Sequence, residues 1–189
     1  MSKGRRHENG SGLIVVILIV AFLAGIGLSL LTLTSMSPKV SGSLRYHEEA
    51  FNAAEAGFDA ARLLIQDRMS SGQWTSFDGH YLTQPTGIDL PLVLDSPNSS
   101  YFRRKTDQEL LQAFDPNGDG TPDVANLLFF NQTLATSADF QHTYTVFLIN
   151  DEAGGGTADA RDALLVTIGV VRAGNRILDT ARLEILLGY

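Results

Sequence analysis

The chain of 189 residues carries a formal charge of −7, with 44% hydrophobic and 19% charged residues. This negative charge argues against a nucleic-acid-binding protein, because such proteins concentrate Lys and Arg to neutralise phosphates. The sequence contains no cysteine, which excludes disulfides, thiolate metal sites and a cysteine nucleophile within it. We expect one globular domain that relies on a hydrophobic core, a bound ion or a partner for its stability.

The first element is an uncharged segment at residues 11–37, which is apolar between residues 13 and 33 apart from a few Gly, Ser and Thr. At about 1.5 Å per residue, roughly 20 such residues in a helix cross a bilayer core of about 30 Å. Residues 1–10 contain three basic side chains and one acidic side chain. Because basic residues beside a span favour the cytoplasmic side, we expect a cytoplasmic leader, one membrane span and a domain outside the cytoplasm.

The junction between leader and span is informative. A secretory signal peptide would have a shorter apolar region followed by a small-x-small cleavage site, and this segment has neither. Instead the leader ends at Gly10 and the apolar run begins directly with Ser11. This junction resembles the class III leader of type IV pilins, which prepilin peptidase cuts after the glycine while the span is kept. The resemblance implies that residues 1–10 are removed and that the new terminus is methylated.

A second motif follows the span at residues 50–57, which read AFNAAEAG. A leader, a span and this motif, in this order and spacing, resemble PilX-type minor pilins over about residues 5–65. Beyond Arg68 the likeness is only generic. The resemblance implies a pilin-like fold, in which a long amino-terminal helix packs on a carboxyl-terminal antiparallel sheet.

Val15 marks a departure from most pilins. Most members keep a glutamate at the fifth mature position, where it is thought to neutralise the amino-terminal amine of the neighbouring subunit. A carboxylate inside a membrane is costly and is kept only for function. A subunit with Val15 cannot pair with the amine of a subunit ahead of it, so it suits the leading position of a filament. The alternative is that Val15 is one more lipid-facing residue.

Residues 38–69 continue the helix in amphipathic form, with an apolar stripe on one side and charged residues on the other. The stripe consists of Phe51, Ala54, Phe58, Ala61 and Ile65, widened by Leu44 and Leu64. The resemblance assigns Val15, Phe51, Ala54 and Phe58 to an assembly helix. The alternative is a plain anchor followed by the first core helix of an unrelated domain.

A capping box is predicted near the middle of the domain. Thr106 and Glu109 have the spacing at which two residues bond each other's backbone N–H groups at the start of a helix. The sequence therefore predicts a short helix that ends near Phe114. Residues 124–130 then return to the core.

Residues 115–126, DPNGDGTPDVAN, form an acidic loop with calcium-type spacing. Calcium prefers six to eight oxygen ligands, supplied in a tight loop by alternate residues around a glycine at the sixth position. The predicted ligands are Asp115, Asn117, Asp119, Thr121 through its carbonyl, and Asp123, with Gly120 at the turn. The loop resembles EF-hand, dockerin and thrombospondin-type repeats, but Asn126 stands where a bidentate glutamate is expected. The alternative is a polar turn with solvated acids.

The carboxyl-terminal part predicts a β-sheet. Three runs have strand patterns, and a short turn at residues 173–175 makes a hairpin of the last two. The runs are residues 142–150, 163–172 and 176–187. We expect an α+β head at residues 70–189, in which a three- to four-stranded antiparallel meander packs on the long helix.

Nothing in the sequence points to catalysis. A nucleophile elbow, a phosphate-binding loop, a metalloprotease motif and a dinucleotide fingerprint are all missing. The four histidines are scattered without ligand-like spacing, which weakens a zinc site. We therefore expect a protein that is not an enzyme.

The resemblance to PilX-type minor pilins implies a function in assembly. The chain would prime a type IV pilus and sit at or near its tip, moving from the bacterial inner membrane to the extracellular pilus. The implied partners are other minor pilins, the major pilin, a tip adhesin, the inner-membrane assembly platform and prepilin peptidase. Two alternatives stay open: a pseudopilin of a type II secretion system, and a single-pass anchor presenting a calcium-stabilised binding domain.

Overall fold

The structure is a computed structural model that describes residues 9–90, 98–150 and 161–188, without the side chains of residues 9–11 and 31–41. The predicted leader lies outside the described residues except for Asn9 and Gly10. The chain separates into two compact units, residues 1–44 and residues 45–189.

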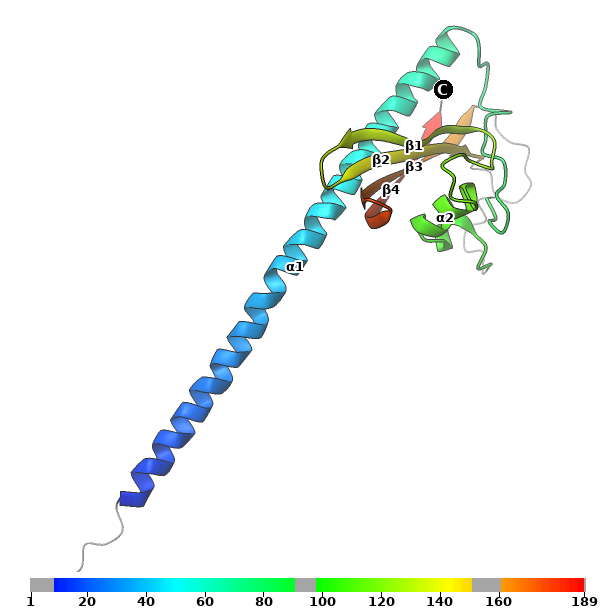
Figure 1. Cartoon of the computed structure of the whole chain (residues 1–189). Helices are drawn as coiled ribbons and strands as arrows, with labels where there is room; N and C mark the ends of the chain where they lie inside the picture. The colour runs from blue at the N-terminus through cyan, green and yellow to red at the C-terminus, as the bar shows by residue number, and fades with distance from the viewer. Residues whose placement is uncertain (1–8, 91–97, 151–160, 189) are drawn as a thin grey trace, which may run out of the picture. The chain divides into compact units, whose positions relative to one another are not determined.

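The described elements are helices at the start and middle of the chain and strands at its end (Figure 1). In chain order they are α1 (Asn9–Ser70), the 3-10 helix η1 (Phe102–Arg104), α2 (Asp107–Phe114), β1 (Leu127–Thr136), β2 (Gln141–Ile149), β3 (Asp162–Ala173) and β4 (Arg176–Gly188). The helix predicted to continue to residue 69 and the helix predicted at the capping box are both confirmed. The three predicted strands agree with β2, β3 and β4 to within about two residues.

The four strands form one antiparallel sheet with the order β1-β2-β3-β4, so each strand pairs with its neighbour in the sequence. This confirms the α+β class and the meander. The strand β1 is longer than its sequence pattern indicates. Its second half is exposed and contains a register shift between Thr133 and Ala135, so it lacks the apolar alternation that identifies a strand.

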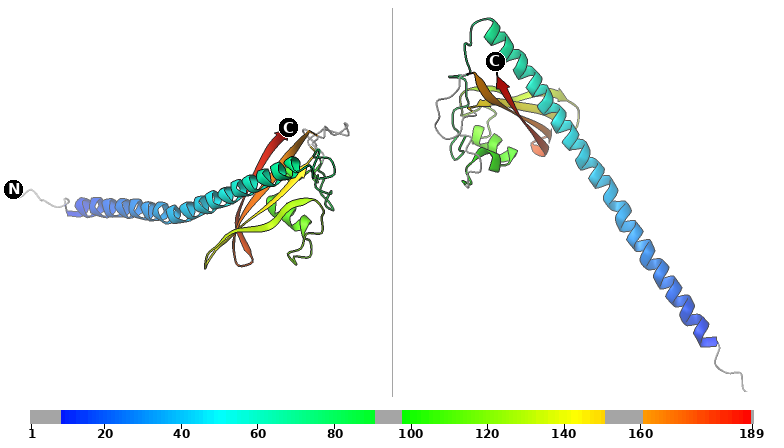
Figure 2. Two further views of the ribbon diagram at one scale, coloured as in Figure 1. Left: turned by 90° about the horizontal axis from the view of Figure 1, so that it is seen from above. Right: turned by 180° about the vertical axis from the view of Figure 1, so that it is seen from behind.

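One face of the sheet packs against residues 45–70 of α1 at very short range (Figure 2). A Cβ atom placed on Gly169 of β3 would lie 2.0 Å from the carbonyl oxygen of Ala50, and one on Gly57 would lie 2.6 Å from Cγ2 of Thr167. These distances are far below van der Waals contact. Glycine at both positions therefore lets the helix backbone approach the sheet.

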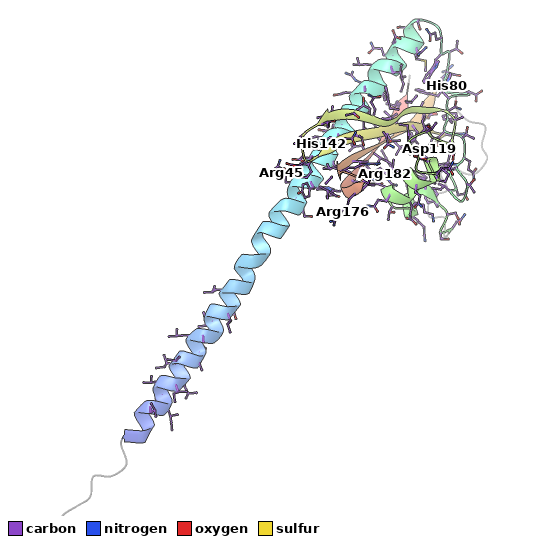
Figure 3. All side chains as sticks on the ribbon, in the orientation of Figure 1. Arg45, His80, Asp119, His142, Arg176 and Arg182 are labelled. Atoms are coloured by element: carbon purple, nitrogen blue, oxygen red, sulfur yellow. The ribbon has the colours of Figure 1, made fainter. Side chains whose placement is uncertain are left out.

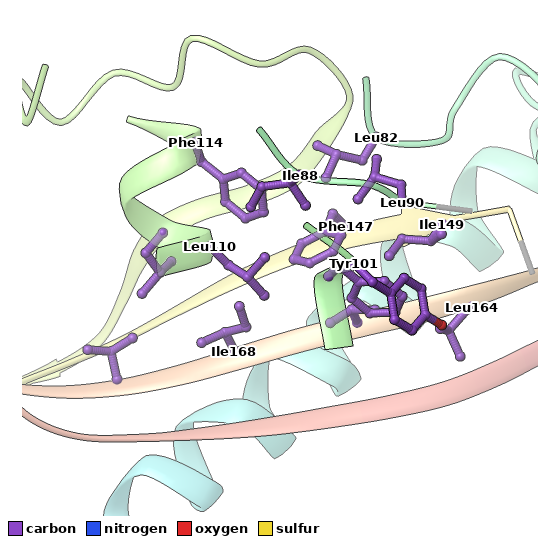
Figure 4. Close-up of a cluster of buried hydrophobic side chains, with 14 residues drawn as sticks. Leu82, Ile88, Leu90, Tyr101, Leu110, Phe114, Phe147, Ile149, Leu164 and Ile168 are labelled. Carbon is purple, nitrogen blue, oxygen red and sulfur yellow. The ribbon is translucent and has the colours of Figure 1, made fainter. Parts of the chain in front are cut away.

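The other face of the sheet carries α2 and the main hydrophobic cluster (Figure 4). Side chains from α2, from β2 and β3 and from the segment before η1 meet there, and most of them are buried. The largest of the fully buried ones are Phe102, Leu110, Phe114, Phe147, Ile149 and Ile168. This cluster and the α1 side together make a three-layered head, helix on sheet on helix.

The predicted apolar stripe of α1 is only partly its packing face. Ala54, Ala61 and Ile65 are buried as expected, but Phe51 is 40% exposed and Leu44 is 60% exposed. The buried face is instead made of small residues: Ala50, Ala53, Ala54, Gly57 and Ala61. The reason is the close approach of the sheet, which leaves no room for phenylalanine between the two backbones.

Candidate functional site

The first unit of the structure is an apolar helix without tertiary cover. Residues Gly12–Leu30 have a mean hydropathy of 3.0, are long and apolar enough to cross a membrane, and none of them is buried within the chain. Exposing so much apolar surface to water is unfavourable, and a helix satisfies its backbone groups internally. This segment therefore fits a lipid bilayer or a bundle of other helices.

The predicted processing and assembly residues lie at the start of this helix. Gly10 and Ser11 fall within the first turn of α1, which begins at Asn9. Val15 follows about one turn later, and its side chain is 51% exposed. No carboxylate lies among residues 12–30, so a buried charge of the usual pilin kind is missing from this helix.

The structure gives different environments to the other three residues assigned to assembly. Ala54 is completely buried against β3, so it belongs to the fold of the head. Phe58 is partly buried and packs on the cluster that contains Tyr144 and Val146. Phe51 is exposed. Of the three, Phe51 has the most surface left for another subunit.

Glu49 joins α1 to β2 through a charged cluster that the sequence does not reveal. Its carboxylate accepts a hydrogen bond from Nε of Arg45 at 2.8 Å and lies 3.1 Å from Nε2 of His142. Figure 3 shows Arg45 and His142 close together at this point. Hydrogen bonds from Arg45 first, and from His142 second, hold the pKa of Glu49 below its ordinary value.

Arg182 of β4 holds the segment before α2 against the sheet. Its Nε donates to Oδ1 of Asp107 at 2.6 Å, and a terminal nitrogen donates to the carbonyl of Lys105 at 2.8 Å. Both side chains of this ion pair are largely buried. Because Asp107 lies in the first turn of α2, its negative charge also interacts favourably with the helix dipole.

The capping box at the start of α2 is present as predicted. The hydroxyl of Thr106 accepts from the backbone N–H of Glu109 at 3.2 Å, and the carboxylate of Glu109 accepts from the backbone N–H of Thr106 at 2.7 Å. These hydrogen bonds hold the pKa of Glu109 below its ordinary value. The helix that they start ends at Phe114, directly before the acidic loop.

The acidic loop is closed by its own hydrogen bonds. The carboxylate of Asp115 accepts from the backbone N–H groups of Gly118, Asp119 and Gly120, at 2.8, 3.2 and 2.9 Å. The side chain of Asn117 donates to that of Asp123 at 3.0 Å, and the backbone N–H of Thr121 donates to Asp119 at 2.7 Å. The five predicted ligands therefore lie in one tight turn.

Two features of the loop bear on the predicted calcium ion. Oδ1 of Asp115 accepts two backbone N–H groups and Oδ2 accepts one, so Oδ2 keeps a second lone pair. The turn is open to solvent, as a weak oxygen-ligand site would be. Within residues 9–90, 98–150 and 161–188, however, no three His, Asp or Glu side chains are already gathered to hold a metal. Calcium binding stays a prediction that depends on rearrangement of Asp119 and Asp123.

Comparison with known proteins bears on the first part of the chain. Residues 9–59 match the family model described as PilX N-terminal. The matched stretch begins where α1 begins and includes the apolar helix and the AFNAAEAG motif. No curated protein and no solved structure matches the chain. The amino-terminal segment of this chain is therefore similar to that of PilX-type pilins.

Proposed function

We propose that this chain is a minor pilin that primes the assembly of type IV pili and sits at or near the pilus tip. The observation that carries the proposal is the PilX N-terminal match over residues 9–59, which takes in both the uncovered apolar helix and the helix segment packed on the head. In this role the inner membrane holds the apolar helix until the subunit enters the filament, where helices of other subunits cover it.

The tip position rests on Val15. A carboxylate here would pair with the terminal amine of the subunit ahead, and Val15 offers only an apolar side chain. A subunit that lacks this carboxylate is suited to the first position of the filament, where no subunit lies ahead. Its partners would be other minor pilins, the major pilin, a tip adhesin and the inner-membrane assembly platform, and it would act as a structural subunit.

The first experiment is mass spectrometry of the mature amino terminus after expression with prepilin peptidase. We expect a chain that begins at Ser11, with its terminal amine methylated. Gly10→Val should leave the leader in place, because a side chain there would obstruct the peptidase, whereas Gly12→Ala should be processed normally. A chain that keeps Met1, or is cut after the apolar helix, would contradict the proposal.

A pseudopilin of a type II secretion system is the second candidate, since the missing carboxylate at Val15 suits its tip subunit as well. Isolation of the chain with its cross-linked neighbours separates the two systems. Type IV pilins among the neighbours support the proposal. Neighbours drawn only from a secretion system support the alternative.

A further inference from the structure

A polar pocket of about 370 Å³ lies between α2, the acidic loop and the sheet. Its walls combine two carboxamides from α2, an arginine at the end of β3 and apolar side chains from β1 and β4. The residues used below are Gln108, Gln112, Phe130, Asn131, Arg172 and Ile177. Neither the sequence patterns nor the pilin assignment gives this pocket a role.

Arg172 is the unusual residue in this pocket. Its guanidinium is half-buried, and a terminal nitrogen donates to Oδ1 of Asn131 at 3.2 Å. Within the described part of the chain its Nε has no hydrogen-bond partner, and no carboxylate forms an ion pair with it. Burial lowers the pKa of Arg172, because no neighbouring anion offsets the loss of water. Burying a cation without a neighbouring anion lowers the free energy of unfolding.

The backbone around Arg172 departs from regular strand geometry at two places. Asn131 has a φ of 45°, in the left-handed region, and the register of β1 against β2 shifts between Phe129 and Gln132. A second register shift lies at Val171 and Arg172 in the pairing of β3 with β4. Such irregularities cost free energy and often serve to aim side chains at a site.

These irregularities are held in place by buried contacts. The backbone N–H of Asn131 donates to Oγ1 of Thr145 at 3.1 Å, and Thr145 is completely buried. The strained residue is therefore held by a buried hydroxyl, while its side-chain oxygen accepts a hydrogen bond from Arg172. This arrangement presents a positioned guanidinium and not a mobile surface charge.

The remaining walls restrict the class of ligand. Gln108 and Gln112 lie one turn apart on α2 and can donate hydrogen bonds, while Phe130 and Ile177 give an apolar side. Asp115 also borders the pocket, although its oxygens already accept three backbone N–H groups. Its negative charge disfavours a dianion such as phosphate. A planar, singly charged carboxylate fits best, because it matches the fork of an arginine.

We propose that this pocket binds a carboxylate group, with Arg172 as the charged partner and Gln108 and Gln112 as further donors. The carboxylate belongs either to a small organic acid or to an acidic side chain of a peptide, which share this chemistry. The proposal does not depend on the assembly function, and failure of one leaves the other standing.

The test is a titration of the full chain in detergent micelles, followed by the NMR signals of its backbone amides and of the Arg172 Nε–H group. The probes are acetate and acetyl-glutamate amide, at constant ionic strength with chloride as the replaced anion and with a calcium chelator present. We expect saturable shifts at Asn131, Thr145 and Arg172, with chloride ineffective. The probe that binds more tightly identifies the source of the carboxylate.

Arg172→Gln should weaken binding about 10- to 100-fold, as expected for the loss of a charge-assisted hydrogen bond. Arg172→Lys keeps the charge without the fork and should bind at an intermediate level, which excludes simple unfolding as the cause. Arg62→Gln removes an exposed charge on α1, across the sheet from the pocket, and should bind like the unaltered chain. Absence of saturable binding, or equal binding by the Arg172→Gln and Arg62→Gln chains, would overturn the proposal.

Discussion

At the scale of single residues, the head is held together by polar and charged side chains that meet from distant parts of the sequence. Arg182 and Asp107 are 75 residues apart, and Glu49 and His142 are 93 residues apart. Neither pair has a local signature, because the periodicity of a strand or helix says nothing about which element packs beside it. Burial gives the first pair its energetic weight, since a desolvated charge without its partner is strongly unfavourable, whereas the second pair is only partly buried.

The substitution Arg182→Ala should lower the free energy of unfolding by about 3 kcal/mol, because it leaves the buried carboxylate of Asp107 without its charge partner. Thermal unfolding of the two chains, monitored by circular dichroism, measures the change. Arg104→Ala removes an exposed arginine from the neighbouring η1 and should cost less than about 0.5 kcal/mol. Equal losses from the two substitutions would refute the structural role of Arg182.

Glu49 should contribute to the pH dependence of stability. Its pKa is lower in the folded chain than in the unfolded chain, mainly because Arg45 and then His142 bond its ionised form. Its contribution is therefore complete above the ordinary glutamate pKa of about 4.3 and is lost as the pH falls through the lower folded value.

Urea unfolding of the Glu49→Gln chain at a series of pH values tests this contribution. At pH 7 the substitution should lower the free energy of unfolding by about 0.5–1 kcal/mol, because the pair is partly exposed. Below about pH 4.3, acidification should destabilise the Glu49→Gln chain less than the unaltered chain. Glu55→Gln, on the exposed face of the same helix, serves as the control. Parallel pH profiles for the unaltered and Glu49→Gln chains would contradict the assignment.

At the scale of elements, two contacts define the head: α1 on the sheet, and α2 with its following loop on the opposite face. The first depends on small residues, because the helix backbone lies almost against β3. The second depends on a capping box that starts α2 and a self-bonded turn that ends it. In both cases the local sequence determines the element, and the neighbouring element determines which of its faces is buried.

Gly169→Ala should destabilise the head by about 1–3 kcal/mol, because the new methyl group would meet the backbone of α1 at Ala50 and Ala54. The midpoint of thermal unfolding reports the loss. Gly188→Ala is a matched control in β4, since a Cβ there has open space around it. An unchanged midpoint for Gly169→Ala would show that α1 does not pack as closely as described.

Calcium should raise the melting temperature of the chain if the acidic loop binds it. A tenfold excess over the dissociation constant stabilises a folded protein by about 1.4 kcal/mol. Asp123→Asn should reduce this shift, whereas Asp139→Asn, which is exposed and outside the loop, should retain it. Identical melting temperatures in calcium and in chelator would show that the loop does not bind calcium.

At the scale of the whole molecule, the chain consists of a helical unit of residues 1–44 and a compact unit of residues 45–189. All of the buried hydrophobic side chains from Ala50 to Ala181 belong to the second unit, while the described side chains of the apolar helix are exposed. The first unit thus presents an apolar surface, whereas the second encloses a hydrophobic core of its own. This division agrees with a subunit that is anchored first and assembled later.

A chain that begins at Arg45 should fold without the apolar helix, because it keeps every buried residue of the core. We expect a single cooperative thermal transition and a soluble product. A chain that begins at Arg62 lacks the small-residue face of α1 and should fail to fold. Aggregation of the longer chain, or a cooperative transition of the shorter one, would contradict this division.

The sequence by itself determined the apolar helix, the helix that continues from it, the capping box of α2, three strands and the resemblance to PilX-type pilins. These features are local: an uncharged run, an apolar stripe along a helix, a pair of residues three apart and alternation along a strand can each be recognised within a short stretch of sequence. The Gly10–Ser11 junction and the acidic loop are local patterns too, and their chemistry stays a prediction.

Only the tertiary structure decided which residues of α1 are buried, because the sheet came close enough to exclude Phe51 and select alanine and glycine. It also decided the pairing of Glu49 with His142, the anchoring of α2 by Arg182, and the pocket in which Arg172 lacks an anion. Each of these depends on residues far apart in the chain being brought together. Periodicity cannot report such contacts, since they depend on the distance and register between elements and not on the pattern within one.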